Sequence, residues 1–306
     1  MKLKTTALLV GSVFAATANA SSFFITVDQD YNGDGDAMTG SINELGYTGT
    51  LSTSFYADPF LSVGSQVIDT NIKSEMDALG FVNGPSTAVD GFTPLTFKYP
   101  TLSSELNIDG LNPLSAFDDV ENFNTPGSGW ALTYQFKLVG EFTATGVAYN
   151  DGYIDVFYNK IPGFDSDLDD AFQTQVGRIN VTGSDLSAAN LFVYGEFSFD
   201  FDGNGTDDSA GDSFIQDFFT DIDTGLTYYD AWSAASPAPI NFVLDTNVNP
   251  PVPTADQLAF TSMGGVMRQA TQDGSVTMTV PEPGSLILIG AGLLGLGLSS
   301  SRKRKA

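Results

Sequence analysis

Alternation between apolar and polar side chains recurs along residues 21–280. In the clearest stretch, the side chains of Trp130, Leu132, Tyr134, Phe136 and Leu138 share one face, and smaller or polar side chains share the other. A period of two is typical of a β-strand with one buried face and one solvated face. The same reasoning predicts strands at residues 21–27, 47–57, 92–99, 191–201, 240–244, 258–263 and 276–280.

Two further strands are predicted at residues 141–149 and 153–158, on either side of the sequence Asn150-Asp151-Gly152. An Asn or Asp followed by Gly is a strong signal for the tight turn of a β-hairpin. We therefore expect these two strands to pair with each other through a turn at residues 150–152.

Helical spacing is clear in two short segments. Ile72, Met76 and Leu79 predict a helix that ends at Gly80, and apolar residues four apart predict a second helix over residues 165–176. Strands and turns dominate the rest of residues 21–279. The sequence therefore predicts a mainly β fold, an antiparallel β-sandwich with one or two short helices. Whether it forms one domain or two is left open.

Residues 1–20 have the features of a signal peptide. Lys2 and Lys4 precede an apolar run at residues 7–16, and Ala18-Asn19-Ala20 supplies the small residues of a cleavage site. We expect cleavage after Ala20 and export of the chain that begins at Ser21.

The other end of the chain has three features in a fixed order. The triplet Pro281-Glu282-Pro283 precedes an uncharged segment at residues 284–301, and four basic residues follow at positions 302–305. A helix that crosses a bilayer needs roughly 17–25 apolar residues, so the uncharged segment predicts a short transmembrane helix. The basic residues are expected to stay on the cytoplasmic side, which places residues 21–279 outside the cytoplasm.

These features in this order resemble the C-terminal sorting tail of the PEP-CTERM family. The resemblance implies a bacterial envelope protein that an exosortase-type sorting protease recognises in the inner membrane, cuts near the triplet and releases or attaches at the surface. It also implies an association with exopolysaccharide production and with biofilm or floc formation. It is confined to residues 280–306 and implies nothing about the fold upstream. The alternative is an ordinary tail anchor.

Composition narrows the chemistry of the exported part. The chain has no cysteine and no histidine, which removes disulfides, histidine-dependent nucleophiles and the usual zinc ligands. Residues 21–280 contain 36 acidic and six basic residues, a formal charge of −30. Such a charge disfavours nucleic acid as a partner, and the surface repels itself unless cations screen it.

Two acidic loops, at residues 28–36 and 200–208, share the spacing D-x-D-x-N-G-x-x-D. Alternate oxygen-bearing side chains on a curled segment can converge on Ca²⁺, and the glycine allows the sharp turn. The predicted ligands are Asp28, Asp30, Asn32, Asp34 and Asp36 in the first loop, and Asp200, Asp202, Asn204, Thr206 and Asp208 in the second.

The first half of this spacing resembles an EF-hand loop. The twelfth positions hold Thr39 and Gly211 in place of the bidentate glutamate. We therefore expect structural calcium sites, with dissociation constants of the order of 10⁻⁴–10⁻³ M, instead of a regulatory EF-hand. The alternative is a series of Asx turns that bind no ion.

The predicted function is that of a non-enzymatic surface or matrix protein, in which divalent ions bridge its carboxylates to anionic exopolysaccharide or to sister molecules. The alternative is a calcium-dependent carbohydrate-binding module, in which Tyr228, Tyr229 and Trp232 stack on sugar rings. A glycosidase that uses Glu141 and Glu196 is the less favoured third possibility.

Overall fold

The computed structural model describes residues 21–100, 110–113, 119, 121–123, 125, 128–162, 173–187, 190–234, 240–247 and 250–280. The strands are β1 (Phe23–Ile25), β2 (Leu45–Tyr56), β3 (Gln66–Thr70), β4 (Gly84–Thr87), β5 (Pro94–Phe97), β6 (Gly110–Pro113), β7 (Ser128–Thr143), β8 (Gly146–Pro162), β9 (Gln173–Ser187), β10 (Asn190–Ser198), β11 (Phe219–Asp221), β12 (Asn241–Asn247), β13 (Ala259–Phe260) and β14 (Val266–Thr279). The helices are α1 (Lys73–Ala78), α2 (Ser213–Asp217), α3 (Tyr228–Ser233) and the 3₁₀ helix η2 (Ala255–Gln257).

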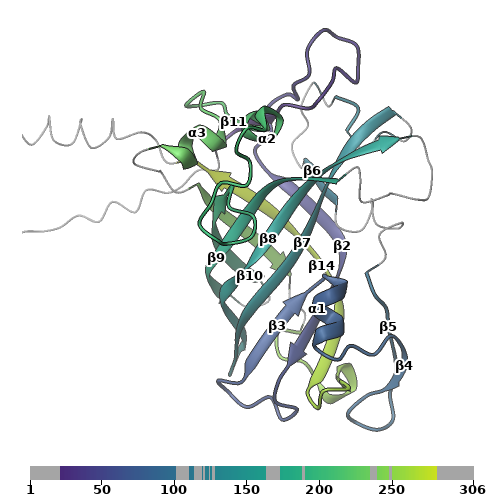
Figure 1. Cartoon of the computed structure of the whole chain (residues 1–306). Coiled ribbons are helices and arrows are strands. Elements are labelled where there is room, and N and C mark those ends of the chain that lie inside the picture. The colour runs from purple at the N-terminus through teal and green to yellow at the C-terminus, as the bar shows by residue number, and fades with distance from the viewer. Residues whose placement is uncertain are drawn as a thin grey trace, which may run out of the picture.

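Within the described residues, eight strands form an antiparallel sheet that closes on itself, in the order β2-β3-β7-β8-β9-β10-β12-β14. The ring is completed where β14 pairs with β2, for example Val266 with Tyr56. Strand β6 bridges β2 and β7, and β13 extends the sheet from β14. Figure 1 shows the long strands wrapped around a common interior.

The predicted mainly β, antiparallel class is confirmed. Walls of the sheet face each other across one apolar core, as in the predicted sandwich, and the core takes buried side chains from β2, β7, β8, β9, β10, β12 and β14. The closure of the ring adds hydrogen bonds between those walls. Within the described residues, each strand of the ring therefore has a paired strand on both sides, whereas an unpaired edge strand is what exposes many β-proteins to aggregation.

The predicted turn at residues 150–152 is wrong. Strands β7 and β8 do form a hairpin, but they meet at Thr143 and Gly146, and residues 150–152 lie inside β8. The register shifts there, so that Asn150 is the extra residue of a β-bulge. Gly152 has φ +120°, and a Cβ on it would lie 2.1 Å from the carbonyl oxygen of Lys137. The Asn-Asp-Gly sequence therefore forms a β-bulge within a long strand and not a hairpin turn.

Of the two predicted helices, the first is confirmed as α1. Met76 is buried, and Gly80 follows the helix with φ +78°. The second prediction falls mainly on residues 163–172, which lie outside the described residues. Its last position, Val176, is buried in strand β9, so a helix does not extend that far. Pairing of β9 with β8 and β10 overrides the helical spacing there.

A small layer covers one end of the closed sheet. Strand β1 pairs with β11, and α2 and α3 lie beside this pair (Figure 1). Phe219 and Tyr228 join it to the main core, because the ring centroid of each lies 5.6 Å from that of Phe197 in β10. The first acidic loop follows β1 of this layer, and the second follows β10 of the closed sheet. The positions of both loops therefore depend on how the layer packs on the sheet.

Residues 21–280, called the body below, contain all the described strand pairs and core side chains. Among the described residues, none of the helices has the length and apolar character that crossing a lipid bilayer requires. The predicted transmembrane helix at residues 284–301 lies outside the described residues, as does the predicted signal peptide at residues 1–20.

Candidate metal centre

The first acidic loop is the tip of a short hairpin. The N–H of Val27 donates to the carbonyl oxygen of Ala37, and the N–H of Thr39 donates to that of Ile25, both over 2.9 Å. The side-chain oxygen of Thr39 also accepts a hydrogen bond from the N–H of Ile25. The two arms of the hairpin therefore fix both ends of residues 28–36.

The two loops have the same hydrogen-bond pattern, but not in the alignment predicted from their spacing. Asp30 accepts hydrogen bonds from the N–H groups three and five residues later, Gly33 and Gly35. In the second loop it is Asp200 that accepts from the residues three and five positions later. Asp30 thus corresponds to Asp200, and the predicted alignment of Asp28 with Asp200 is wrong by two residues.

Backbone conformation supports this corrected alignment. Gly33 and Gly203 have φ +82° and +76°, and Gly35 and Gly205 have φ +110° and +85°. Glycine is the residue that adopts such angles without strain. Counted from Asp30 and Asp200, both loops therefore carry glycines at the fourth and sixth positions, and the sixth is where a calcium-binding loop makes its sharp turn.

Asp28, a predicted calcium ligand, makes different contacts. Its carboxylate forms an ion pair with Lys160 and accepts hydrogen bonds from Tyr158 and, over 2.8 Å, from Tyr31. Burial raises the pKa of Asp28, but these hydrogen bonds outweigh it and the net pKa is lowered. Asp28 therefore anchors the loop to strand β8. The correction follows from β8 supplying a cation and a hydroxyl beneath the loop, which the local spacing did not reveal.

Four carboxylates converge beside the first loop. Asp34 and Asp36 meet Asp119 and Glu121, and one oxygen from each lies within 4.8 Å of the others. Asp119 and Glu121 were not predicted as site residues. They come from a segment far along the chain, and nothing in their local sequence indicates the partner loop. Asn32 joins the two segments, because its side-chain N–H donates to Asp119 over 2.8 Å.

Glu121 is the most constrained member of this cluster. The residue is 0% exposed, and its Oε2 accepts a hydrogen bond of 2.8 Å from the backbone N–H of Tyr31. Its other oxygen, Oε1, is buried and has no hydrogen-bond partner among the residues that the structure describes. The indole N–H of Trp130 donates to the backbone carbonyl of Glu121 over 2.9 Å and so holds the segment in place.

Electrostatics at the cluster favour a bound cation. Burial raises the pKa of Glu121, and the nearby charges of Asp119 and Asp34 raise it further, against the hydrogen bond from Tyr31. Burial also raises the pKa of Asp119, with a contribution from Asp34. A carboxylate oxygen that is buried without a partner is costly unless something compensates it. A divalent ion would compensate Glu121 and relieve the repulsion.

The spacing suits calcium. Calcium–oxygen distances of about 2.3–2.6 Å place two ligand oxygens at most about 5 Å apart around one ion, and the cluster satisfies this limit. The donor set is all oxygen, as a hard cation requires. Glu121 lies beside the first loop, where it could take the place of the acidic residue at the twelfth position of an EF-hand loop.

The second loop brings together a smaller set. Asp200, Asp202 and Asp208 place one carboxylate oxygen each within 4.8 Å of the others, as the spacing predicted. Asn204 turns its side-chain oxygen toward the N–H of Thr206, which lies 2.8 Å away. The carboxylate groups here are half-buried or exposed.

The aromatic residues predicted to stack on sugars have different environments. Tyr228 is 0% exposed and stacks on Phe219 in the core, so its ring is not available to a ligand. Tyr229 and Trp232 are half-buried, with ring centroids 6.2 Å apart. The hydroxyl of Tyr229 donates to Asp207, next to the second loop's Asp208, over 2.8 Å. Trp130 is fully buried, as its alternating pattern predicts.

The two glutamates named for a glycosidase do not form a pair. Glu141 lies in β7 and Glu196 in β10, and both are exposed. Strands β8 and β9 separate them, which corresponds to about 14 Å at a strand spacing of about 4.8 Å. Carboxyl pairs in glycosidases are about 5–9.5 Å apart. This pair is too widely spaced for that chemistry.

Comparison with known proteins identifies one region. The PEP-CTERM protein-sorting motif matches residues 279–304, at the C-terminus. Searches of curated proteins and of solved structures gave no match. The triplet Pro281-Glu282-Pro283 lies within the matched region, outside the described residues. The resemblance of the tail to the PEP-CTERM family is therefore confirmed.

Proposed function

We propose that this chain, which carries a PEP-CTERM sorting motif at residues 279–304, is a calcium-binding structural protein of the bacterial cell surface or extracellular matrix. The motif indicates an exported protein that passes through a membrane-anchored intermediate and is processed by an exosortase. The body then acts outside the cytoplasm without catalysing a reaction. Its role is cohesion, through divalent ions that join it to anionic exopolysaccharide or to other copies of itself.

The observation that supports calcium is Glu121 in the four-carboxylate cluster, because one oxygen of its carboxylate, Oε1, is buried without a hydrogen-bond partner in the described part of the chain. Exposed acidic loops occur on many proteins without binding an ion. A buried carboxylate oxygen without a hydrogen-bond partner is different, because desolvation penalises it unless a cation or proton lies beside it. The first loop is therefore the primary site, and the second loop, which shares its hydrogen-bond pattern, is the secondary one.

The charge of the body supports a cohesive role. With 36 acidic and six basic residues, copies of the body repel one another and repel anionic polysaccharide at low ionic strength. Divalent cations reverse this repulsion when they bridge carboxylates on two surfaces. Association in the presence of calcium and dispersion on its removal follow from the same charge.

Calorimetric titration of the calcium-free body with CaCl₂, with thermal melts in parallel, tests the proposal. We expect saturable binding with a dissociation constant of the order of 10⁻⁴–10⁻³ M, a melting temperature that rises with calcium, and reversible association that EDTA disperses. Calcium binding without association would contradict the cohesive role. An unchanged melting temperature and aggregation state on addition of EDTA would contradict the calcium site as well.

The alternative is a calcium-dependent carbohydrate-binding module. The observation in its favour is the half-buried pair Tyr229 and Trp232, tied to the second loop through Asp207. A polysaccharide array probed with and without calcium separates the two functions. Selective binding to one sugar sequence favours the module, whereas binding that follows the density of negative charge favours the cohesive protein.

A further inference from the structure

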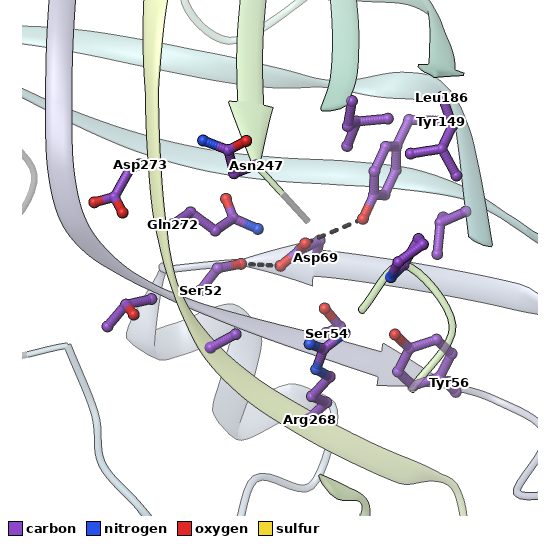
Figure 2. Close-up of a pocket in the computed structure, with 15 residues that line it drawn as sticks. Ser52, Ser54, Tyr56, Asp69, Tyr149, Leu186, Asn247, Arg268, Gln272 and Asp273 are labelled. Carbon is purple, nitrogen blue, oxygen red and sulfur yellow. Dashed lines mark hydrogen bonds between the residues drawn. The ribbon is translucent and has the colours of Figure 1, made fainter. Parts of the chain in front are cut away.

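A polar cavity of about 270 Å³ lies inside the closed sheet, away from the acidic loops. Side chains of β2, β3, β8, β9, β10, β12 and β14 line it, so it is enclosed by most of the ring. Figure 2 shows Asp69 near its centre, with dashed hydrogen bonds to Ser52 and Tyr149, and Arg268 on the side of Ser54 and Tyr56.

Two other spaces inside the ring are much smaller. They measure about 10 and 20 Å³, and mainly aromatic and aliphatic side chains line them. Protein interiors are close-packed, and voids larger than a few water molecules are uncommon. A space of 270 Å³ holds about nine waters at roughly 30 Å³ each. The hollow therefore belongs to one part of the sheet and is not general loose packing.

Asp69 is the strongest sign that this hollow is a binding site. The residue is 3% exposed on strand β3, and its carboxyl group accepts hydrogen bonds from Ser52 and, over 3.0 Å, from Tyr149. Its side chain is on the inward face of β3, where the alternation of a strand normally places an apolar residue. A buried carboxyl group destabilises the fold unless it is compensated, so its presence in the core indicates a use other than stability.

The positive charge of Arg268 partly offsets the negative charge of Asp69. The residue is 6% exposed on β14, its guanidinium donates to the carbonyl oxygen of Pro250 over 2.7 Å, and its charge acts on Asp69. The buried side chains of the cavity thus include one acid and one base, and together they offer no excess of either charge to a ligand; the other acid in the lining, Asp273, is exposed to solvent.

The remaining walls combine two kinds of group. Ser54, Asn247 and Gln272 carry hydroxyl or amide groups, which both donate and accept hydrogen bonds. Leu186 and Leu191 form an apolar wall. A ligand that matches both kinds has hydroxyl groups on its rim and C–H groups on a face.

We propose that this cavity binds a neutral, hydroxyl-rich small molecule of about the size of one hexose. Asp69 accepts hydrogen bonds from the ligand's hydroxyl groups, the amide and hydroxyl side chains complete the polar contacts, and the leucine wall packs on its C–H face. This site is separate from the acidic loops and does not require calcium.

Calorimetric titration of the calcium-free body with glucose, galactose and mannose tests this proposal, with glucuronate, glucosamine and hexanol as charged and apolar probes. We expect saturable binding of at least one neutral hexose, with no comparable binding of the other probes. The proposal is overturned if none of the three hexoses binds, or if a charged or apolar probe binds more tightly than they do.

Two variants locate the site. Ala270→Leu fills the cavity from β14 without removing a polar group, and we expect it to abolish hexose binding; Thr277→Leu, on the same strand but outside the cavity, is the matched control. Asp69→Asn keeps the shape of the side chain, and we expect at least tenfold weaker binding. Binding that survives Ala270→Leu, or that appears only with calcium, would place the sugar elsewhere and overturn the assignment.

Discussion

The backbone N–H of Tyr31 donates a 2.8 Å hydrogen bond to Oε2 of Glu121, a residue 90 positions further along the chain. The other oxygen of this glutamate, Oε1, is buried and has no hydrogen-bond partner among the described residues, and the carboxylate lies in one cluster with Asp34 and Asp36. The loop thereby acquires from a distant segment the acidic group that its own sequence lacks. The candidate calcium site is a product of the tertiary fold and not of the loop alone.

Replacement of that acid is the first test. Glu121→Gln keeps the side-chain volume but removes the negative charge, so we expect calcium binding at the first loop to weaken at least tenfold, about 1.4 kcal/mol at 25 °C. Calorimetry with CaCl₂ measures this. Glu141→Gln, on the exposed face of β7, is the control and should bind as the wild type does. Equal affinity in the two variants would show that Glu121 is not a ligand.

The β-bulge in β8 predicts a contrast between two glycines. Gly152→Ala places a Cβ 2.1 Å from the carbonyl oxygen of Lys137 at φ +120°, and we expect it to lower the free energy of unfolding by about 2 kcal/mol or more. Gly183→Ala, in β9, has nothing within 4 Å and should change it by less than about 1 kcal/mol. Urea denaturation of both variants measures the difference, and equal losses would contradict the bulge.

A buried ion pair joins β8 to β9. Nε and Nη2 of Arg178 donate to the two carboxylate oxygens of Asp155 over 2.6 and 2.8 Å, and the guanidinium lies 4.1 Å from the ring centroid of Tyr153. Burial raises the pKa of Asp155 in spite of this contact, which indicates a desolvated acid that depends on its partner.

We expect Arg178→Met to destabilise the body by about 3 kcal/mol, because it leaves the buried acid without a cation and with only the hydrogen bond from Gln175. Asp155→Leu combined with Arg178→Met should cost less than the single change, since both charges are then removed. A double-mutant cycle by urea denaturation measures the coupling. Additive losses would show that the two charges act independently.

Asp69 predicts a pH dependence of stability. Burial raises its pKa above the ordinary 3.8, so the folded state keeps this proton at pH values where the unfolded state has lost it. The contribution to stability is therefore fully present below pH 3.8 and is lost as the pH rises through the raised pKa. In Asp69→Asn, the part of the change in unfolding free energy with pH that comes from Asp69 should disappear. Urea denaturation of calcium-free wild type and variant across pH 3.5–8 measures it, and identical slopes would contradict it.

The sorting motif predicts a change in location. Alanine in place of Pro281, Glu282 and Pro283 should leave the chain uncut in the inner membrane, because the match to the motif spans these positions. Membrane fractionation with an antibody to the body measures this. Asp256→Ala, outside the motif, should be processed normally. Normal processing of the triple variant would show that another signal directs the protein.

Sequence patterns predicted much of the fold, and they failed where pairing partners decide the outcome. The alternation from Trp130 to Leu138 predicted a half-buried strand because side chains in a strand alternate by geometry alone. The Asn-Asp-Gly sequence was misassigned because a turn and a bulge need the same backbone freedom at Gly152. Only the register of β7 against β8 distinguishes them.

The sorting tail, the antiparallel β class and the two acidic loops can all be recognised from the amino-acid sequence, because each depends on residues close together in the chain. Only contacts in the folded chain show that the sheet closes, that Asp28 pairs with Lys160 and that Glu121 is hydrogen-bonded to the first loop. The tertiary structure alone placed Asp69 and Arg268 in one cavity. These contacts join residues far apart in the chain, and local spacing carries no information about which distant side chain the folded sheet brings near.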